Sequence, residues 1–363
     1  KNHTRVSEEQ LRDLLSYSTI SEDFDKDDAM DIMQAIYSCK ILDPACGSGA
    51  FPMGILQQLV HMLGQLDPDN NYWHDIVLRS AEKDSRMVFQ SSMTSEEKIE
   101  RIQDINESFD ENVNSPDYSR KLYLIENCIY GVDIQPIAAQ ISKLRFFISL
   151  VVEQKPTKNN KANFGIRPLP NLDAKFVAAN TLLPIAKKQK MLFDDPRIET
   201  LQNLQKDACH RLFCAKTART KRKYEDKISE LRAEIAGLLL ENKSIGNEDA
   251  QLISKWDMFD QNASADFFDS EWMFGLSDSF DIVLGNPPYI QLQNDHGKLA
   301  VLYESKGYDS FAKTGDIYCL FYERGLDMLK DDGILTFITS NKWMRAGYGE
   351  KLRKVLSEES NPL

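Results

Sequence analysis

The chain has no long apolar run and few histidines and cysteines. None of its apolar stretches approaches the roughly 20 residues that a bilayer-spanning helix needs. Its first residues, KNHTRVSEEQ, lack the charged-then-apolar layout of a signal peptide. The five histidines and six cysteines form no CxxC pair and no cluster at ligand spacing. We therefore expect a cytoplasmic protein with reduced thiols and no metal site.

Positive charge is also scarce. Lys and Arg number 44 against 56 Asp and Glu, which gives a formal net charge of −12. Such a chain repels a polyanion at long range, so a nucleic-acid reader built on it needs a local basic face or a separate domain. The sequence contains no internal repeat and no low-complexity tract. Its 42% hydrophobic and 28% charged residues are typical of a soluble globular protein.

Apolar periodicity predicts alternating strands and helices after a helical lead-in over residues 1–36. We expect an α/β fold over residues 37–363, with a doubly wound, mostly parallel sheet and helical insertions at about 67–127 and 184–270. The expected strands are 41–43, 129–133, 175–179, 280–285 and 333–339. Helices are expected from the apolar spacings of Phe51, Ile55, Leu59 and Leu63, and of Ile137, Ile141, Leu144, Ile148 and Val151.

The second insertion contains a segment, 200–243, that is typical of a helical hairpin. Its apolar residues alternate spacings of three and four, as a coiled-coil seam does. They are Ile228, Leu231, Ile235 and Leu238. A basic run in the same segment contacts phosphates or, as we favour, forms a solvated helix face. The run comprises Lys216, Arg219, Lys221, Arg222, Lys223 and Lys227.

A glycine-rich turn follows the first strand. Gly47 and Gly49 let turn amides and a helix N-terminus approach a ligand closely. The dinucleotide-binding fingerprint is not met, because Pro52 stands where a third glycine is needed. Asp133 ends the second strand, where a carboxylate is able to accept hydrogen bonds from both hydroxyls of a ribose. The alternative for Asp133 is a solvated aspartate at a strand end.

The sequence Asn286-Pro287-Pro288-Tyr289 directly follows the apolar run 280–285. The two prolines stiffen the backbone and remove two amide donors, which leaves carbonyls free to accept hydrogen bonds. The Asn286 side-chain oxygen and the Pro287 carbonyl are able to accept hydrogen bonds from the two N–H groups of an exocyclic amine, while Tyr289 stacks on the base. The alternative is a turn that merely ends the strand.

These motifs share one position in the expected fold. Ligands of open parallel sheets bind at the carboxyl ends of the strands. Gly47, Asp133, Asn180 and Asn286 all follow strands. The sequence therefore predicts one pocket that holds a cofactor and a base side by side.

The motifs occur in the order seen in amino-methylating DNA methyltransferases of the gamma arrangement. They are Asp43-Pro-Ala-Cys-Gly-Ser-Gly-Ala-Phe51, Gly131-Val-Asp-Ile134, Asn180, Asp281-Ile-Val-Leu-Gly-Asn-Pro-Pro-Tyr-Ile290, Gly315-Asp-Ile-Tyr-Cys-Leu-Phe321 and Ile338-Thr-Ser-Asn-Lys-Trp343. From about residue 38 to 357 the chain resembles the methylase part of Eco57I-like, type IIG restriction-modification enzymes. The resemblance implies a class I methyltransferase fold that uses S-adenosylmethionine.

The resemblance also assigns roles to residues. The turn after the first strand would surround the methionine part of the cofactor, Asp133 its ribose, Ile134 its adenine ring and Asn180 its adenine edge. The turn residues are Asp43, Pro44, Ala45, Gly47 and Gly49. The four residues Asn286, Pro287, Pro288 and Tyr289 would be catalytic, transferring methyl in line to N6 of an adenine flipped out of double-stranded DNA. The chain would be the modification part of a restriction-modification system.

Two features of the family are not evident in the sequence: an upstream cofactor-binding segment and a target-recognition domain. We therefore expect a catalytic-domain fragment that works with recognition or nuclease domains of a parent protein. Pro68-Asp69 and Glu96-Glu97-Lys98 match a nuclease PD...ExK pattern by letter, but they lie in a polar insertion. We expect no DNA cleavage.

Two alternatives remain open. Protein-glutamine N5 methyltransferases also present a planar amide to an NPPY motif. A non-catalytic DNA-binding or assembly subunit that retains the fold is the other.

Overall fold

The computed structural model describes residues 6–17, 24–87, 95–168, 170–185, 196–215, 217–242, 244–276 and 279–362. Two compact units share the chain. Unit 1 comprises Lys1–Cys39, Met53–Ile129 and Leu144–Pro170, and unit 2 comprises Lys40–Pro52, Tyr130–Lys143 and Asn171–Leu363.

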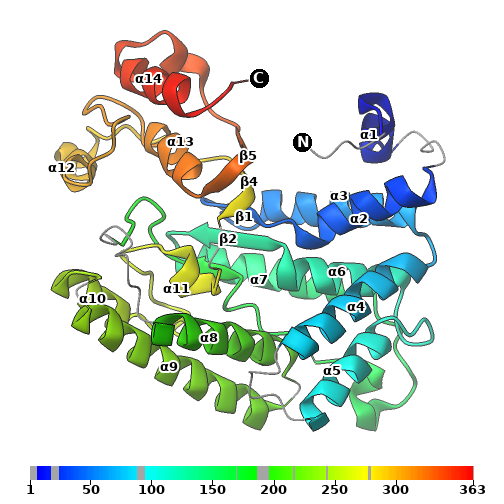
Figure 1. Cartoon of the computed structure of the whole chain (residues 1–363). Coiled ribbons are helices and arrows are strands. Elements are labelled where there is room, and N and C mark those ends of the chain that lie inside the picture. Colours follow the sequence, from blue (N-terminus) through cyan, green and yellow to red (C-terminus); the bar gives the residue numbers. More distant parts are fainter. Residues whose placement is uncertain are drawn as a thin grey trace. The chain divides into compact units, whose positions relative to one another are not determined.

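A five-stranded sheet forms the centre of unit 2, in the order β3-β2-β1-β4-β5 (Figure 1). Its strands are β1 (Ile41–Asp43), β2 (Ile129–Asp133), β3 (Phe176–Ala178), β4 (Phe280–Gly285) and β5 (Leu329–Phe337). The pairs β1 with β4, β2 with β3 and β4 with β5 are parallel. The strand order reverses between β1 and β4, which is the topological switch point of a doubly wound sheet. The prediction of an α/β fold with a mostly parallel sheet is confirmed.

The middle strands are apolar because both of their faces are covered. All three residues of β1 are buried, and in β4 the side chains of Val283 and Leu284 are almost completely buried. Such runs are typical of parallel sheets with helices on both sides. β5, the last strand in the sheet order, differs: its residues are exposed or half-buried along its length.

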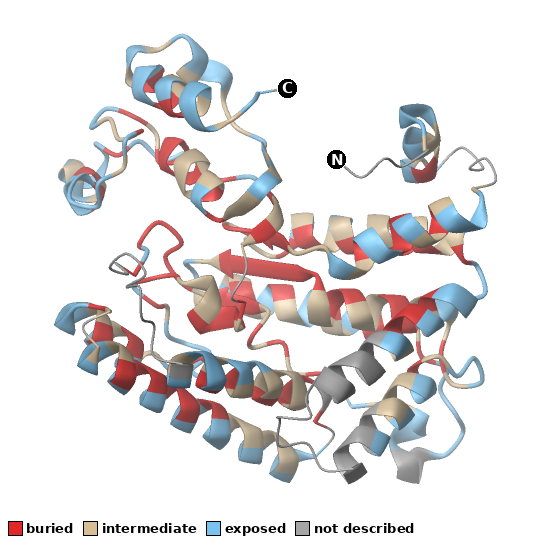
Figure 2. Cartoon of the chain, viewed as in Figure 1, coloured by how far each residue is buried: buried red, intermediate tan, exposed pale blue. Residues whose placement is uncertain are grey.

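The predicted hairpin is formed by α8 (Pro196–Cys214) and α9 (Ala218–Glu241), which lie side by side (Figure 1). The seam residues Ile228, Leu231, Ile235 and Leu238 are buried. Figure 2 shows the corresponding buried stripe on α9 with an exposed stripe opposite. α10 (Asn247–Lys255) and α11 (Ser270–Phe274) follow, and the buried side chains of this region join those of β1, β2 and β4 in one core cluster.

The basic run falls on the solvent face of α9. Arg219, Arg222, Lys223 and Lys227 are exposed, as the solvated-face interpretation predicts. Lys216 lies outside the described residues.

The C-terminal part of unit 2 is built from short helices around β5. They are η3 (Asp295–Gly297), α12 (Lys298–Glu304), α13 (Tyr318–Asp327), η4 (Asn341–Met344), η5 (Gly347–Gly349) and α14 (Glu350–Glu359). α13 packs against both β5 and α14. Tyr318 and Leu352 are completely buried in the cluster between α13 and α14.

Unit 1 is helical. It contains α1 (Glu8–Leu15), α2 (Lys26–Ser38), α4 (Asn71–Met87), α5 (Ser95–Ser108), α6 (Pro116–Asn127), η2 (Asn160–Gly165) and most of α3 (Ala50–Leu66). Its core includes the rings of Tyr37 and Tyr123, stacked with centroids 4.6 Å apart, and the buried Trp73 against Tyr123 at 5.3 Å. Among the helices of the described segments, none is both long and apolar enough to cross a membrane.

The helix α7 (Pro136–Val151) exists as predicted, but its isoleucine and leucine stripe is not the buried face. The isoleucine and leucine side chains of that stripe are exposed: Ile137, Ile141, Leu144 and Ile148. The helix instead buries Ala139, Ser142 and Phe146. At Ser142 the turn after β1 comes close to the helix, since a β-carbon at Gly49 would lie 2.8 Å from Ser142 Oγ. Only a small side chain at position 142 allows this approach.

The tight packing of β2 yields a testable prediction. A β-carbon at Gly131 would lie 2.7 Å from Cδ1 of the buried Phe176 and 3.0 Å from Cys46 Sγ. Gly131→Ala is therefore expected to reduce the free energy of unfolding by about 1–3 kcal/mol, measured as a lower urea midpoint.

A matched glycine in the same unit provides the control. Gly237 lies inside α9, and a β-carbon placed on it would have no described atom within 4 Å apart from its chain neighbours and the backbone of its own helix. Because alanine favours a helix over glycine by up to about 1 kcal/mol, Gly237→Ala is expected to raise the midpoint. Equal shifts for the two variants would contradict the packing argument.

Candidate active site

The turn after β1 is shaped by two glycines in the left-handed region. Gly47 has φ +53° and Gly49 has φ +79°, conformations that L side chains rarely adopt. Nothing lies within 4 Å of a β-carbon placed on Gly47, so the space above it is open. α3 begins at Ala50, directly after the turn. The strand, glycine turn and helix start are thus arranged as the sequence predicts.

Asp133, at the end of β2, holds this turn in place. Its Oδ2 accepts a hydrogen bond from the Gly47 amide at 2.9 Å, and its Oδ1 accepts one from the Gln135 amide at 2.8 Å. Each carboxylate oxygen retains further acceptor capacity. The next residue, Ile134, has a side chain that is 56% exposed. A fixed carboxylate beside an exposed apolar side chain suits a ligand with both polar and flat apolar parts.

Asp43, at the end of β1, has a buried carboxyl group. Its Oδ1 accepts a hydrogen bond from the Ala45 amide at 3.0 Å, while its buried Oδ2 has no hydrogen-bond partner in the described structure. The pKa of Asp43 is raised to about 7, mainly by burial; the Ala45 hydrogen bond opposes this rise and the charge of Asp133 adds to it. An unpartnered oxygen of this kind suits a ligand that brings a cation or a donor.

The loop after β3 connects to the β1 turn. Thr181 Oγ1 donates a hydrogen bond to the Pro44 carbonyl at 2.7 Å. The side chain of Asn180 is buried, where its Nδ2 donates to Tyr303 Oη at 3.1 Å and its Oδ1 accepts from the Leu182 amide at 3.1 Å. Asn180 is thus oriented by protein contacts on both ends of its amide.

The segment after β4 presents its polar side chain to solvent. Asn286 is exposed, and its side-chain amide makes no hydrogen bond within the described segments, whereas Pro287 is buried. Tyr289 is 52% exposed and donates from Oη to the Ile338 carbonyl at 2.9 Å. Its ring meets that of Tyr318 edge-on, with centroids 5.7 Å apart. The Tyr289 ring is therefore held at its rim while part of it stays accessible.

Three contacts bring these strand ends to one edge of the sheet. The Gly47 amide donates a hydrogen bond to Asp133, and the Thr181 hydroxyl donates one to the Pro44 carbonyl. Gly285 approaches Asp43 so closely that a β-carbon on it would lie 2.6 Å from Asp43 Oδ1. Gly285 immediately precedes Asn286. The carboxyl ends of β1, β2, β3 and β4 therefore supply one site in unit 2.

Comparison with known proteins shows the family of the chain. Residues 127–362, well over half of the chain, match the family model described as Eco57I restriction-modification methylase. The chain belongs to the Eco57I restriction-modification methylase family. The match includes Asp133, Asn180 and Asn286, and it begins after the β1 turn.

Individual relatives match over shorter stretches. The type II methyltransferase M.XhoI of Xanthomonas vasicola is 35% identical over 106 residues, which are 27% of this chain and 19% of M.XhoI. M.PaeR7I of Pseudomonas aeruginosa is 39% identical over 83 residues, covering 23% of this chain and 14% of the relative. The type II restriction enzyme and methyltransferase RM.Eco57I of Escherichia coli is 39% identical over 82 residues, 22% of this chain and 8% of its own length. The matched stretches thus span less than a fifth of each relative.

Three residues at this site of the Eco57I-family chain were not predicted from the sequence. Thr181 and Tyr303 fix the loop after β3, and Gly285 gives Asp43 its space. Gly285 carried a local signal, since a glycine interrupts an apolar strand just before Asn286. Tyr303 carried none, because it lies 123 residues from its partner Asn180.

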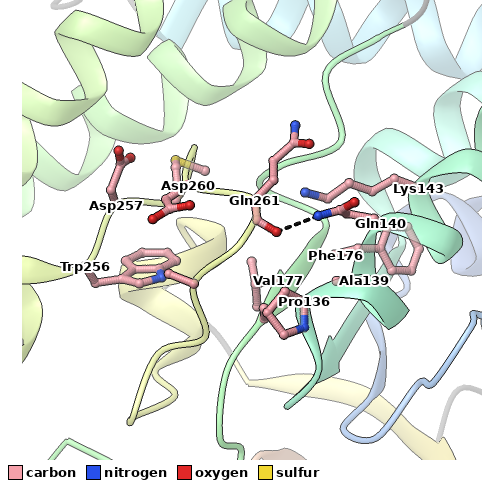
Figure 3. Close-up of a pocket in the computed structure, with 13 residues that line it drawn as sticks. Pro136, Ala139, Gln140, Lys143, Phe176, Val177, Trp256, Asp257, Asp260 and Gln261 are labelled. Atoms are coloured by element: carbon pink, nitrogen blue, oxygen red, sulfur yellow. Dashed lines mark hydrogen bonds between the residues drawn. The ribbon is translucent and has the colours of Figure 1, made fainter.

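The small pocket in Figure 3 is a different feature. It is lined by the start of α7, by β3 and by residues 256–263, and Gln140 Nε2 donates to the Gln261 carbonyl across it at 2.5 Å. Its cavity volume of about 20 Å³ holds little more than a water molecule. None of the predicted site residues lines it. The candidate site is therefore the open edge of the sheet and not this pocket.

The buried carboxyl group of Asp43 predicts a pH dependence of stability. Its pKa rises from an ordinary 3.8 to about 7 on folding, so the folded chain binds the proton more tightly than the unfolded one. The free energy of unfolding should then fall as pH rises from about 4 to about 7, with no further loss from this group at higher pH. A rise of about three pKa units corresponds to at most ~4 kcal/mol.

Asp43→Asn removes this titration. Urea unfolding at pH 5, 6, 7 and 8 should therefore show the wild type losing stability relative to the variant up to about pH 7, and a constant difference above it. A difference that stays constant from pH 5 to pH 8 would contradict the assignment.

Proposed function

We propose that this chain is the catalytic part of a DNA methyltransferase that transfers a methyl group from S-adenosylmethionine to N6 of adenine. The observation that carries the proposal is the convergence of Asp43, Asp133 and Asn286 on one sheet edge, with the Asn286 amide exposed and unpaired. Membership of a family of restriction-modification methylases supports methyl transfer as the reaction.

The chemistry of the strand ends fits S-adenosylmethionine. The unpartnered Asp43 Oδ2 suits a cofactor that carries positive charge, and the open space above Gly47 admits it close to the backbone. Asp133 would accept hydrogen bonds from the ribose hydroxyls with its remaining acceptor capacity, and Ile134 and Asn180 would hold the adenine ring. When bound, this cofactor supplies an electrophilic methyl group on sulfur.

The residues after β4 would activate the acceptor. The Asn286 side-chain oxygen and the Pro287 carbonyl accept hydrogen bonds from the two N–H groups of the N6 amine. These hydrogen bonds draw the nitrogen lone pair out of conjugation with the ring. Neither Pro287 nor Pro288 has an amide hydrogen that would compete for these acceptors. Tyr289, held at its hydroxyl by Ile338, stacks on the flipped base. The protein contributes alignment and exclusion of water.

We propose double-stranded DNA as the substrate, with the target adenine flipped out of the helix. M.XhoI and M.PaeR7I are type II methyltransferases, and RM.Eco57I is a type II restriction enzyme and methyltransferase. This favours DNA over a glutamine side chain as the acceptor. It also supports the proposal that recognition or nuclease parts of a parent protein act with this chain.

The acceptor role of Asn286 is testable. Asn286→Ala removes one of the two acceptors for the amine, and the loss of one such transition-state contact typically lowers the rate about 10²–10³-fold. We expect incorporation of tritiated methyl as N6-methyladenine in mixed-sequence DNA to fall by this factor, while binding of S-adenosylmethionine is retained.

Asn247→Ala, an exposed asparagine at the start of α10, is the matched control and should leave the rate unchanged. Methyl transfer to a glutamine-containing peptide with none to DNA would replace the proposal by the protein methyltransferase. A chain that binds no cofactor would support a non-catalytic subunit.

The cofactor role of Asp133 is tested separately from DNA. Asp133→Asn replaces one carboxylate oxygen with an NH₂ group, which cannot accept the hydrogen bond from the Gly47 or the Gln135 amide. It also removes the negative charge that strengthens hydrogen bonds from the ribose hydroxyls. Hydrogen bonds to charged groups contribute about 1.5–3 kcal/mol, so calorimetry should show cofactor affinity reduced roughly 10- to 100-fold. Glu248→Gln, on the exposed side of α10, should bind as the wild type does.

A further inference from the structure

The acidic chain contains one strongly basic stretch beside the catalytic motif. Residues 338–354, here called the basic segment, hold five basic residues and a single acidic one, Glu350. The basic residues are Lys342, Arg345, Lys351, Arg353 and Lys354. In a chain with a net charge of −12, this stretch is a local excess of positive charge of the kind that a nucleic-acid reader needs.

The basic segment starts in contact with the residues around the NPPY motif. The Ile338 amide donates to the Gly285 carbonyl at 3.0 Å, and the Ile338 carbonyl accepts from Tyr289 Oη at 2.9 Å. Ile338 is thus hydrogen-bonded to residues on both sides of Asn286. A ligand that binds at the start of the basic segment therefore lies next to the proposed base-binding site.

The first part of the basic segment is a turn whose backbone is held by side-chain hydrogen bonds. Ser340 caps η4 by accepting from the Lys342 amide at 3.3 Å, and Arg353 Nη1 donates to the carbonyls of Trp343 at 2.6 Å and Ala346 at 3.1 Å. A β-carbon at Gly349 would lie 1.9 Å from the Trp343 carbonyl oxygen, so only glycine permits this path. These contacts fix the backbone from which the exposed side chains project.

The exposed side chains of this turn combine charge with apolar surface. Lys342 and Arg345 are exposed, and neither forms an ion pair within the described segments. By contrast, Lys354 lies 3.9 Å from Glu358 and Arg353 is used by the turn itself. Two large apolar side chains accompany the free cations: Ile338 is 60% exposed and Met344 is 57% exposed. Cations contact phosphates, and apolar side chains contact sugars and bases.

We infer that the turn 340–345 contacts the DNA strand beside the target adenine, with Lys342 and Arg345 on backbone phosphates and Ile338 and Met344 against the adjoining sugars or bases. This inference rests on the proposed function. DNA is the occupant that the charge favours, because two unpaired cations next to a base-binding motif complement a polyanion whose base enters that motif. The contacts position the strand and carry no sequence information.

The test compares two double variants in duplex binding followed by fluorescence anisotropy at several salt concentrations. Each phosphate contact contributes about 0.9 to the slope of log K against log salt. Lys342→Ala with Arg345→Ala should weaken binding to mixed-sequence duplex roughly 10- to 100-fold at low salt and make the slope about 1.8 less steep. Thermal unfolding and cofactor binding should match the wild type.

Arg222→Ala with Lys223→Ala removes two exposed cations from α9 and is the matched control. It should leave both affinity and slope close to those of the wild type. Equal effects of the two double variants, an unchanged slope for the first, or no duplex binding by the wild type would overturn the inference. Failure of the proposed function would be distinct, because it would appear as absent methyl transfer in a chain whose DNA binding still responds to Lys342 and Arg345.

Discussion

The close approach of β1 and β4 constrains the rest of the candidate site. Gly285 leaves room for the Asp43 carboxyl group, because a β-carbon there would come within 2.6 Å of Oδ1. The same contact places the residue before Asn286 against the residue that starts the β1 turn. A larger side chain at position 285 would separate the two strand ends. The proposed cofactor and base sites are neighbours because of this one packing constraint.

The remaining strand ends are added by hydrogen bonds to the same turn. Asp133 holds Gly47 from β2, and Thr181 holds Pro44 from the loop after β3. Burial of Asp43 without a partner for Oδ2 leaves a carboxyl group whose pKa is about 7. Such a group stays costly to ionise until a ligand supplies a donor or a positive charge. Hydrogen bonds therefore join the backbone segments of the site, while one oxygen of Asp43 lacks a partner among the described residues.

Much of the fold could be predicted because its signals are local. The apolar run 280–285, the glycine turn and the seam of the hairpin each lie within a few residues, and the structure contains the corresponding strand, turn and helices. The buried face of α7 could not be predicted from periodicity. Its isoleucines resemble a core stripe, yet Ser142 faces inward, where the β1 turn at Gly49 approaches too closely for a larger side chain. Roles assigned to Asp43, Asp133, Asn180 and Asn286 remain predictions.

The sequence by itself determined the fold class and the residues that follow each strand, since strand periodicity and turn chemistry are properties of short segments. Only the tertiary structure decided which of these residues meet. The pairing of Asn180 with Tyr303, the approach of Asp43 to Gly285 and the link from Tyr289 to Ile338 join residues far apart in the chain. No local pattern encodes such contacts, because they arise from the order and packing of the strands.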